Sequence, residues 1–468
     1  MTARPHWFPS PRALRAACLA LVVGSLGCPA NEGLDPPADS FFYPVTLAAS
    51  PSGNWLYVTS SDFDLRYNGG TVAPIDLACL RARVEDPTHA HCAALPNAPG
   101  IRCVGDRDQP GGFVCESRAF VRADQVRRIS PYAVDSAIAR YPDRTRLYVA
   151  VRGDGSVTWF DLDDNGGLDC GADGPLARCG DDHRVGADSA QSPTAARLPP
   201  DPSAISLDPA RGWVLVTHQS NDVGLPRVSL IRDGAVAGGG GAPVLLSTLG
   251  NLSPGLSGAA LLPRAVGSDE RSTWVVTSRS EASLSFFQAY PGNAELRDAK
   301  PFLYRSAIVG VRGLSGGGNN RAIALDPDAS RHRAFVVSRA PEALLSVTLD
   351  PANPMAAVVA DVLPVPLGPS RLVVRSVAGH TQVLVVSFDA RRITVIDPDE
   401  RRVIGQVVTR RGPHQALLDP GPTQPFLYLV DFLDGALEVI DLRLPVDPAS
   451  PGTYLRRVLT LAPQLPQE

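Results

Sequence analysis

Seven short apolar segments recur along this chain and constrain its fold more than any other feature. Each is rich in β-branched, leucine or aromatic residues, as buried strands are. They occupy residues 56–59, 147–150, 214–217, 274–277, 335–338, 384–387 and 427–430. A segment that recurs this often predicts a repeated unit that obtains its core by stacking against its neighbours.

The segments around these repeats complete a unit of short strands. Several repeats follow a strand that ends in Asp-Pro, and several precede a strand that ends in Asp, as at 205–209 and 157–161. Proline fixes φ and cannot continue a hydrogen-bonded ladder, so each Asp-Pro pair indicates a turn. The last repeats lie about 40 to 50 residues apart, which is the length of a four-stranded blade.

The predicted fold is therefore all-β, a β-propeller of seven four-stranded blades with loop insertions. It spans residues 41–463, with disulfide-bearing insertions at about 78–124 and 168–198 and a short tail at 464–468. The inner strand of the second blade is expected near 131–141. The outer strand of the seventh blade is expected from 454–461.

Two of the repeats also resemble a known family. Leu56-Tyr57-Val58-Thr59 and Leu147-Tyr148-Val149-Ala150, each followed by a strand that ends in Asp, resemble the YVTN family of β-propeller repeats. The resemblance covers about residues 44–461 and implies the fold. It implies little about function, because members of that family bind, scaffold or occasionally catalyse.

The first forty residues are typical of an exported bacterial lipoprotein. Arginines precede an apolar run at 16–26, which is too short to span a bilayer, so we expect residues 1–27 to be a signal peptide. The sequence Leu26-Gly27-Cys28 resembles a lipobox, which implies lipidation of Cys28, with simple cleavage as the alternative. Residues 28–40 would then form a flexible tether. The expected location is the cell envelope, as an outer-membrane lipoprotein.

Cysteine content agrees with export. Six cysteines remain after the signal segment, and an even number in an exported chain favours disulfides. Cys170 and Cys179 flank a turn and are expected to pair. The other four, Cys79, Cys92, Cys103 and Cys115, allow three pairings. A zinc site is the rival interpretation, but the spacing of these cysteines is unlike that of a zinc knuckle.

One acidic segment resembles the first half of a calcium-binding loop. Asp161, Asp163, Asn165 and Asp169 place alternating oxygen ligands before and after a glycine turn, so calcium is the one cofactor that the sequence suggests. The glutamate that normally ends such a loop is absent. The alternative interpretation is a solvated acidic turn.

A propeller gathers its loops at the mouth of the central channel, where we predict the binding face. The loops that enter the inner strands, and the hairpins after the second strands, emerge there together. Their polar residues are Asp62, Arg152, Asp154, His218, Asn221, Arg279, Glu281, Arg321, Arg339, Arg371, Asp389, His414 and Asp431. Paired arginines suit an acidic or hydroxylated ligand, whereas a merely solvated rim is the alternative.

No motif indicates a catalytic centre, and the predicted function is non-enzymatic. We expect an envelope protein that binds or scaffolds a protein or polysaccharide partner. The alternative is a lactonase-like hydrolase or isomerase with a metal at the channel mouth. The formal net charge of −4 offers no basic surface for nucleic acid, which we exclude as a partner.

Overall fold

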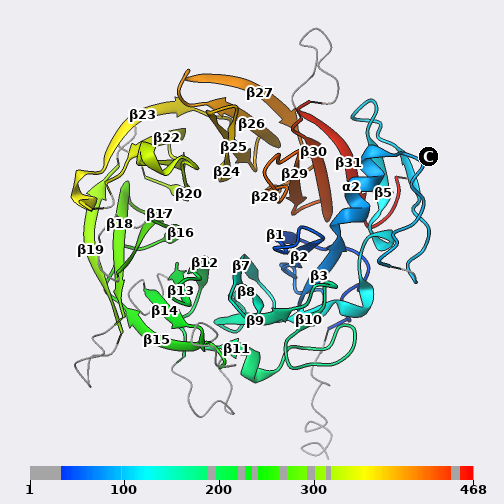
Figure 1. The fold of residues 1–468 in the computed structure, drawn as a ribbon, viewed down its shortest axis with the longest axis horizontal. Helices are drawn as coiled ribbons and strands as arrows, with labels where there is room; N and C mark the ends of the chain where they lie inside the picture. Colours follow the sequence, from blue (N-terminus) through cyan, green and yellow to red (C-terminus); the bar gives the residue numbers. More distant parts are fainter. Residues whose placement is uncertain are drawn as a thin grey trace, which may run out of the picture.

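Seven antiparallel sheets surround a central axis in the computed structural model of the chain, and this arrangement confirms the predicted seven-bladed propeller (Figure 1). The structure describes residues 33–95, 97–186, 197–219, 227–234, 241–263, 271–291, 301–311, 318–350, 352–443 and 454–466. Cys28 and Asn221 lie outside these residues.

The innermost strand of each blade lines the channel, and each packs against the inner strands of the two neighbouring blades, so the ring is closed. These strands are β1 (Pro44–Ala49), β7 (Ala133–Arg140), β12 (Pro202–Asp208), β16 (Leu256–Leu261), β20 (Asn320–Leu325), β24 (Pro369–Val377) and β28 (Pro413–Leu418).

The seven apolar repeats all lie in the second strands. These are β2 (Trp55–Ser60), β8 (Thr145–Val151), β13 (Trp213–His218), β17 (Ser272–Ser278), β21 (Arg333–Arg339), β25 (His380–Ser387) and β29 (Phe426–Asp431). The third strands are β3 (Gly70–Asp76), β9 (Ser156–Leu162), β14 (Val228–Arg232), β18 (Ser283–Tyr290), β22 (Glu342–Thr348), β26 (Arg392–Asp397) and β30 (Ala436–Asp441).

The outer strands vary most between blades. They are β6 (Arg127–Ile129), the short pair β10 (Leu168–Asp169) and β11 (Arg184–Val185), β15 (Val244–Leu249), β19 (Phe302–Gly310), β23 (Val358–Pro364), β27 (Arg402–Val408) and β31 (Arg456–Ala462). In the second blade β10 and β11 both pair with β9, so the insertion there supplies the outer edge.

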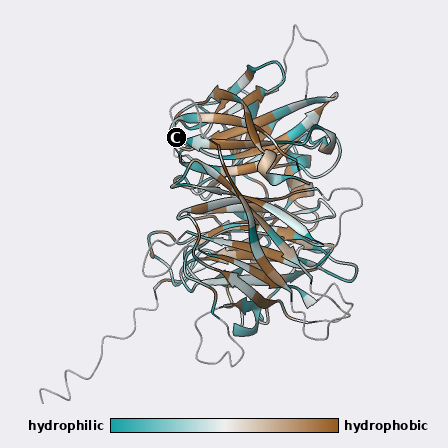
Figure 2. Cartoon of the chain, turned by 90° about the vertical axis from the view of Figure 1, so that its left-hand side faces the viewer, coloured by the Kyte–Doolittle hydropathy of each residue, from teal (hydrophilic) through white to brown (hydrophobic). Residues whose placement is uncertain are grey.

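The second strands are apolar throughout because both of their faces are buried. In β8, Leu147 and Val149 pack in one hydrophobic cluster with the first blade, whereas Tyr148 and Ala150 pack in another with the third. Side chains alternate between the two faces of a strand, and here each face meets a neighbouring blade. Figure 2 shows the apolar residues concentrated along the strands.

The insertion after the first blade's third strand closes the ring. It contains α2 (Leu77–Glu85), β4 (Cys103–Gly105) and β5 (Phe113–Glu116), and β5 pairs in parallel with β31 of the seventh blade. The seventh sheet therefore ends in two strands that come from the first blade's insertion.

Three disulfides stabilise the insertions. The predicted Cys170–Cys179 bond is present, and the pairing left open by the sequence is sequential, Cys79 with Cys92 and Cys103 with Cys115. Bonded cysteines are not free to hold zinc. In the described part of the chain, no helix is long and apolar enough to cross a membrane.

Candidate anion-binding site at the channel mouth

Every inner strand has an irregularity in its register at the same place, near its first residue. The pairing shifts between Pro44 and Thr46 in the first blade and at the equivalent point in the other six. A bulge of this kind redirects a side chain out of the ladder. Six of the redirected residues line one cavity, and we call them the bulge ring: Val45, Val134, Ser203, Arg321, Ser370 and His414.

A second ring comes from the hairpins at the ends of the second strands. In each blade the residue at this position donates its backbone N–H to the carbonyl of the residue before the inner strand, as Arg279 does to Gly255 at 2.7 Å. We call these residues the hairpin ring: Ser61, Arg152, Gln219, Arg279, Arg339, Phe388 and Phe432. All seven line the same cavity.

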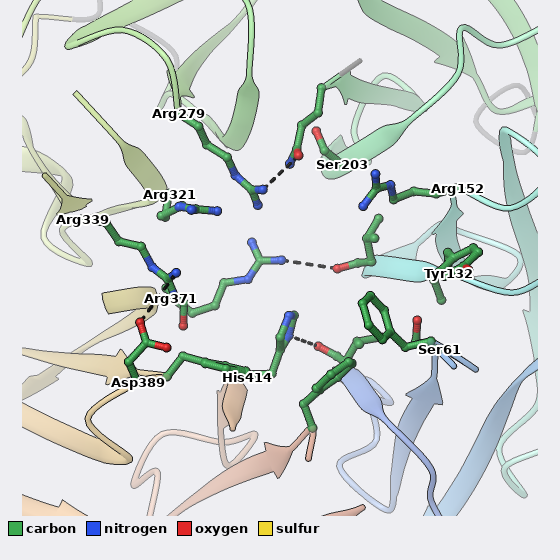
Figure 3. A pocket seen from close by; sticks show the side chains of 18 residues that line it. Ser61, Tyr132, Arg152, Ser203, Arg279, Arg321, Arg339, Arg371, Asp389 and His414 are labelled. Carbon is green, nitrogen blue, oxygen red and sulfur yellow. Dashed lines mark hydrogen bonds and ion pairs between the residues drawn. The ribbon is translucent and has the colours of Figure 1, made fainter. Parts of the chain in front are cut away.

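The two rings enclose most of a cavity of about 510 Å³ at the mouth of the channel (Figure 3). This volume lies within the range of roughly 300 to 1,000 Å³ that is usual for small-molecule sites. Phe63, Tyr132, Ala133, Arg371 and Asp389 complete the wall. Every blade contributes its hairpin residue to the site, and every blade but the fourth also contributes its bulge residue. The chemistry of the site is therefore set by the residues that each repeat carries at these two equivalent positions.

Five arginines reach this cavity, and three of them have a carboxylate partner. Arg152 pairs with Asp201, Arg339 lies 3.9 Å from Asp389, and Arg371 lies 3.8 Å from Asp135. Arg371 belongs to the sixth blade and Asp135 to the second, so the Arg371 side chain extends across the channel mouth.

Backbone carbonyls fix the Arg339 guanidinium. It donates to the oxygens of Pro369 and Gly368, both at 3.1 Å. Gly368 has a φ of +72°, and a Cβ there would lie 2.1 Å from a carboxylate oxygen of Asp389. Glycine at this turn therefore lets Asp389 approach Arg339.

The other two arginines have no carboxylate partner within the described residues. Arg279 donates to the side-chain oxygen of Gln219 at 2.9 Å, and the Nε of Arg321 is buried without a hydrogen bond. Burial, with the charges of Arg321 and Arg371, lowers the pKa of Arg279 to about 9. Burial and the charges of Arg339 and Arg371 lower the pKa of Arg321 to about 10, against a smaller opposing effect of the Asp389 carboxylate. Both remain cationic at neutral pH, in a setting that favours a compensating anion.

His414 is neutral in this environment. Burial, with the charge of Arg371, lowers its pKa to about 3. Its Nδ1 lies 2.8 Å from the carbonyl oxygen of Val45, so this nitrogen carries the hydrogen and donates it. His414 is thus a poor proton acceptor at neutral pH and contributes mainly shape to the wall.

Aromatic rings form the other side of the cavity. Phe432 packs against Phe63 with ring centroids 5.4 Å apart, and against Phe388 at 6.4 Å. Phe63 also meets Tyr132 edge to face. The Phe63 side chain remains 56% exposed, so this apolar wall is open toward the solvent.

Seven of the thirteen residues predicted for the binding face line the cavity: Arg152, Arg279, Arg321, Arg339, Arg371, Asp389 and His414. Five others lie outside its lining: Asp62, Asp154, His218, Glu281 and Asp431. Asp62, His218 and Asp431 are buried beneath the loops. His218 bonds to the Pro200 carbonyl and to Ser229, and burial lowers its pKa to about 4. Their place at the loops follows from the repeat, but their side chains do not reach the cavity.

The aromatic residues were missed because the prediction considered only polar loop residues, and Gln219 was missed although its neighbours His218 and Asn221 were selected. One signal could have found them. Phe388, Phe432 and Gln219 occupy the same position of the repeat as Arg152 and Arg279. Alignment of the repeats on their second strands therefore identifies the whole hairpin ring from sequence.

The predicted calcium ligands are divided among local interactions. Asp161 pairs with Arg146 at 2.6 Å, whereas Asp163 accepts from the backbone of Asn165 and Gly167. Asp169 accepts from the backbone of Gly171. The carboxylate oxygens of the three aspartates do not all lie within 4.8 Å of one another. The calcium site stays a prediction.

A single group of three or more His, Cys, Asp or Glu side chains comes within metal-binding range in the described ranges. It consists of Asp76, Cys79 and Cys92, and those two cysteines form a disulfide. The channel mouth contains no such group of described residues.

Comparison with known proteins supports the fold. No protein-family model matches the chain, and no curated protein sequence matches it. Hydrazine synthase of Kuenenia stuttgartiensis superposes with a TM-score of 0.50 at 12% identity, over 86% of this chain and 96% of that one. A proposed 6-phosphogluconolactonase from Bacteroides uniformis gives 0.50 at 13% identity, over 78% and 85%. At these identities the chain shares with both the β-propeller fold, and the resemblance to YVTN repeats stays a prediction.

Proposed function

We propose that this chain is a non-enzymatic binding protein of the bacterial cell envelope, and that its channel mouth holds the anionic group of a protein or polysaccharide partner. The observation that carries the proposal is the set of five arginines around one cavity. Arg279 and Arg321 have no carboxylate partner among the described residues.

An anion would stabilise this arrangement for a physical reason. Unpaired guanidinium groups that are partly withdrawn from water lose hydration without a compensating charge. A carboxylate, phosphate or sulfate supplies that charge, and guanidinium groups bind such oxygens in pairs. Arg279 and Arg321 come from the fourth and fifth blades, so one anion could engage neighbouring blades together.

The hydrolase alternative has less support from the same residues. The described cavity wall has one carboxylate, Asp389, and one imidazole, His414, and no group of three His, Cys, Asp or Glu side chains comes within metal-binding range there. Metal-assisted hydrolysis is usually built on at least three protein ligands. Five arginines in one cavity favour binding of an anion over activation of a water molecule for hydrolysis.

Calorimetric titration of small anions tests the proposal. Citrate, inorganic phosphate and sulfate are titrated at low ionic strength into the wild type and into the double variant Arg279→Gln/Arg321→Gln. We expect the double variant to lose at least about tenfold in affinity, because two charge-assisted contacts disappear.

The matched control is Arg402→Gln/Arg456→Gln, which removes the same net charge from exposed outer-strand positions. It should bind as the wild type does. Equal weakening in the two double variants would show that net charge, and not the cavity, governs binding. Absence of binding by the wild type for all three anions would overturn the proposed function.

The lipid anchor is a separate part of the proposal and rests on the sequence Leu26-Gly27-Cys28. The three disulfides are compatible with export. Replacing Cys28 by Ser should move the protein from the membrane fraction to the soluble fraction. Retention of the variant in the membrane through both low-salt and high-salt washes would contradict an anchor at this residue.

A further inference from the structure

We propose that the ligand is an acidic saccharide, bound with its carboxylate on the arginines and with one face of its pyranose ring on the aromatic wall. This inference rests on the proposed function and specifies its ligand. It is carried by the division of the cavity into a cationic sector and an aromatic sector, together with hydroxyl and amide groups in the same wall.

The division follows from the repeat. At the hairpin ring, the second, fourth and fifth blades carry Arg152, Arg279 and Arg339, whereas the sixth and seventh carry Phe388 and Phe432. The same position of the repeat thus supplies a guanidinium group on one side of the channel mouth and an aromatic side chain on the other. A ligand that uses the whole mouth must present an anionic end and an apolar face.

The aromatic sector has the form of a platform. Phe432 is in contact with Tyr43 at 5.1 Å between ring centroids and with Phe63 at 5.4 Å, so its orientation is fixed by neighbours from the first blade. Phe63 in turn keeps more than half of its surface exposed. Fixed rings with an open face lose little entropy when a flat, partly apolar group packs on them.

Groups that recognise hydroxyls are distributed around the same wall. Ser61, Ser203 and Ser370 present hydroxyls, Gln219 an amide, and Asp389 a carboxylate that is about half exposed. Ser203 already donates to the Leu256 carbonyl and also hydrogen-bonds the Thr217 hydroxyl. Ser370 donates to the Val386 carbonyl, so its oxygen is available chiefly as an acceptor. These groups can exchange hydrogen bonds with the hydroxyls of a sugar.

The three kinds of group distinguish an acidic sugar from other anions. A small ringless anion would engage the arginines alone, and an aromatic carboxylate would engage the arginines and the aromatic wall without using the serines, the amide or Asp389. Hydrogen bonds between these groups and sugar hydroxyls would add affinity that neither of those anions gains. A uronic acid residue satisfies the cationic, aromatic and hydroxyl-binding parts together.

The test compares four probes by calorimetry on the wild-type protein. They are trigalacturonate, the neutral trisaccharide maltotriose, citrate as a ringless anion, and benzoate as an aromatic carboxylate. We expect trigalacturonate to bind at least about tenfold more tightly than each of the others, because it alone uses all three parts of the site.

Variants then separate the two sectors. Phe63→Ala and Phe432→Leu should each weaken trigalacturonate about fivefold to tenfold while leaving citrate affinity unchanged, because they remove the platform and keep the charges. Phe63→Ala alters an exposed side chain, so its effect does not depend on the fold of the core. Phe302→Ala, an exposed aromatic on β19, is the control and should change neither affinity.

The outcomes distinguish the two proposals. If citrate and trigalacturonate bind equally, and the Phe variants alter neither, the saccharide inference is wrong while anion binding stands. If benzoate binds more tightly than trigalacturonate, the ligand is an aromatic acid and the inference is likewise overturned. If no anionic probe binds, both the saccharide inference and the proposed function are wrong.

Discussion

Arg457 in β31 donates two hydrogen bonds to one carboxylate oxygen of Asp106, at 3.0 and 2.8 Å, across a separation of 351 residues. The same guanidinium donates to Glu438 at 2.8 Å. Asp106 lies between β4 and β5 in the first blade's insertion, so this contact joins the first blade to the last. All three side chains are buried.

Replacing Arg457 by Met should therefore lower the free energy of unfolding by about 3 to 5 kcal/mol, because it leaves Asp106 and Glu438 as buried charges without their partner. Chemical denaturation near neutral pH measures the change. Arg456→Met, at an exposed position on the same strand, should alter the free energy by less than about 0.5 kcal/mol. Similar values for the two variants would contradict a role of this contact in ring closure.

The Cys103–Cys115 disulfide supports the same closure, since it joins the two strands that extend the seventh sheet. Changing both cysteines to Ser should cost about 3 kcal/mol, as expected for a loop of this length. Hydrogen exchange should also become faster in β31. The control is Cys170→Ser/Cys179→Ser, which breaks a bond in the second blade's insertion and should leave β31 protected. Equal protection of β31 in both variants would contradict the prediction.

The seven blades were predictable because a strand that is buried on both faces is apolar at every position. Such a segment can be recognised from the sequence alone. The sequence also predicted the outer strand of the seventh blade from 454–461, and the structure has β31 there. The pairing of β5 with β31 was not predictable. Three residues of β4 and four of β5 carry no pattern of their own, and their partner lies at the other end of the chain.

The candidate site was predictable in part. A regular repeat places the loops at one face, which was enough to select Arg152, Arg279 and Arg339. It does not determine whether a side chain points into the channel or into a blade. Asp431 lies one repeat position before Phe432, at the place that His218 occupies in the third blade, and both side chains are buried.

Asp431 and Glu438 should make stability depend on pH. Burial and the charge of Glu438 raise the pKa of Asp431, and burial raises the pKa of Glu438 to about 7. The folded protein then holds protons that the unfolded chain has already released, so the free energy of unfolding falls as pH rises from the ordinary carboxyl range toward neutrality.

Replacing Asp431 by Asn should reduce this slope and stabilise the protein by about 1 to 2 kcal/mol at about pH 8, because a neutral side chain replaces a carboxylate whose two oxygens have no hydrogen-bond partner. Thermal unfolding between about pH 5 and pH 8 measures both effects. Glu400→Gln, at a surface position, is the control and should keep the wild-type slope. An unchanged slope in Asp431→Asn would contradict the prediction.

Arg279 should make anion binding depend on pH in the alkaline range. Its pKa is lowered to about 9 by burial and by the neighbouring arginines, whereas a bound anion beside it would raise that pKa again. Binding must then take up a proton above about pH 9, so the affinity for citrate should be constant between about pH 7 and 8 and fall by up to tenfold per unit above about pH 9. In Arg279→Gln the affinity should be lower at neutral pH, and the fall should begin closer to the pKa of Arg321, about 10. Calorimetry in buffers of different ionisation enthalpy measures the proton uptake directly. A wild-type affinity that stays constant to about pH 10.5, or identical profiles in the two proteins, would contradict the deprotonation of Arg279 as the cause of the pH dependence.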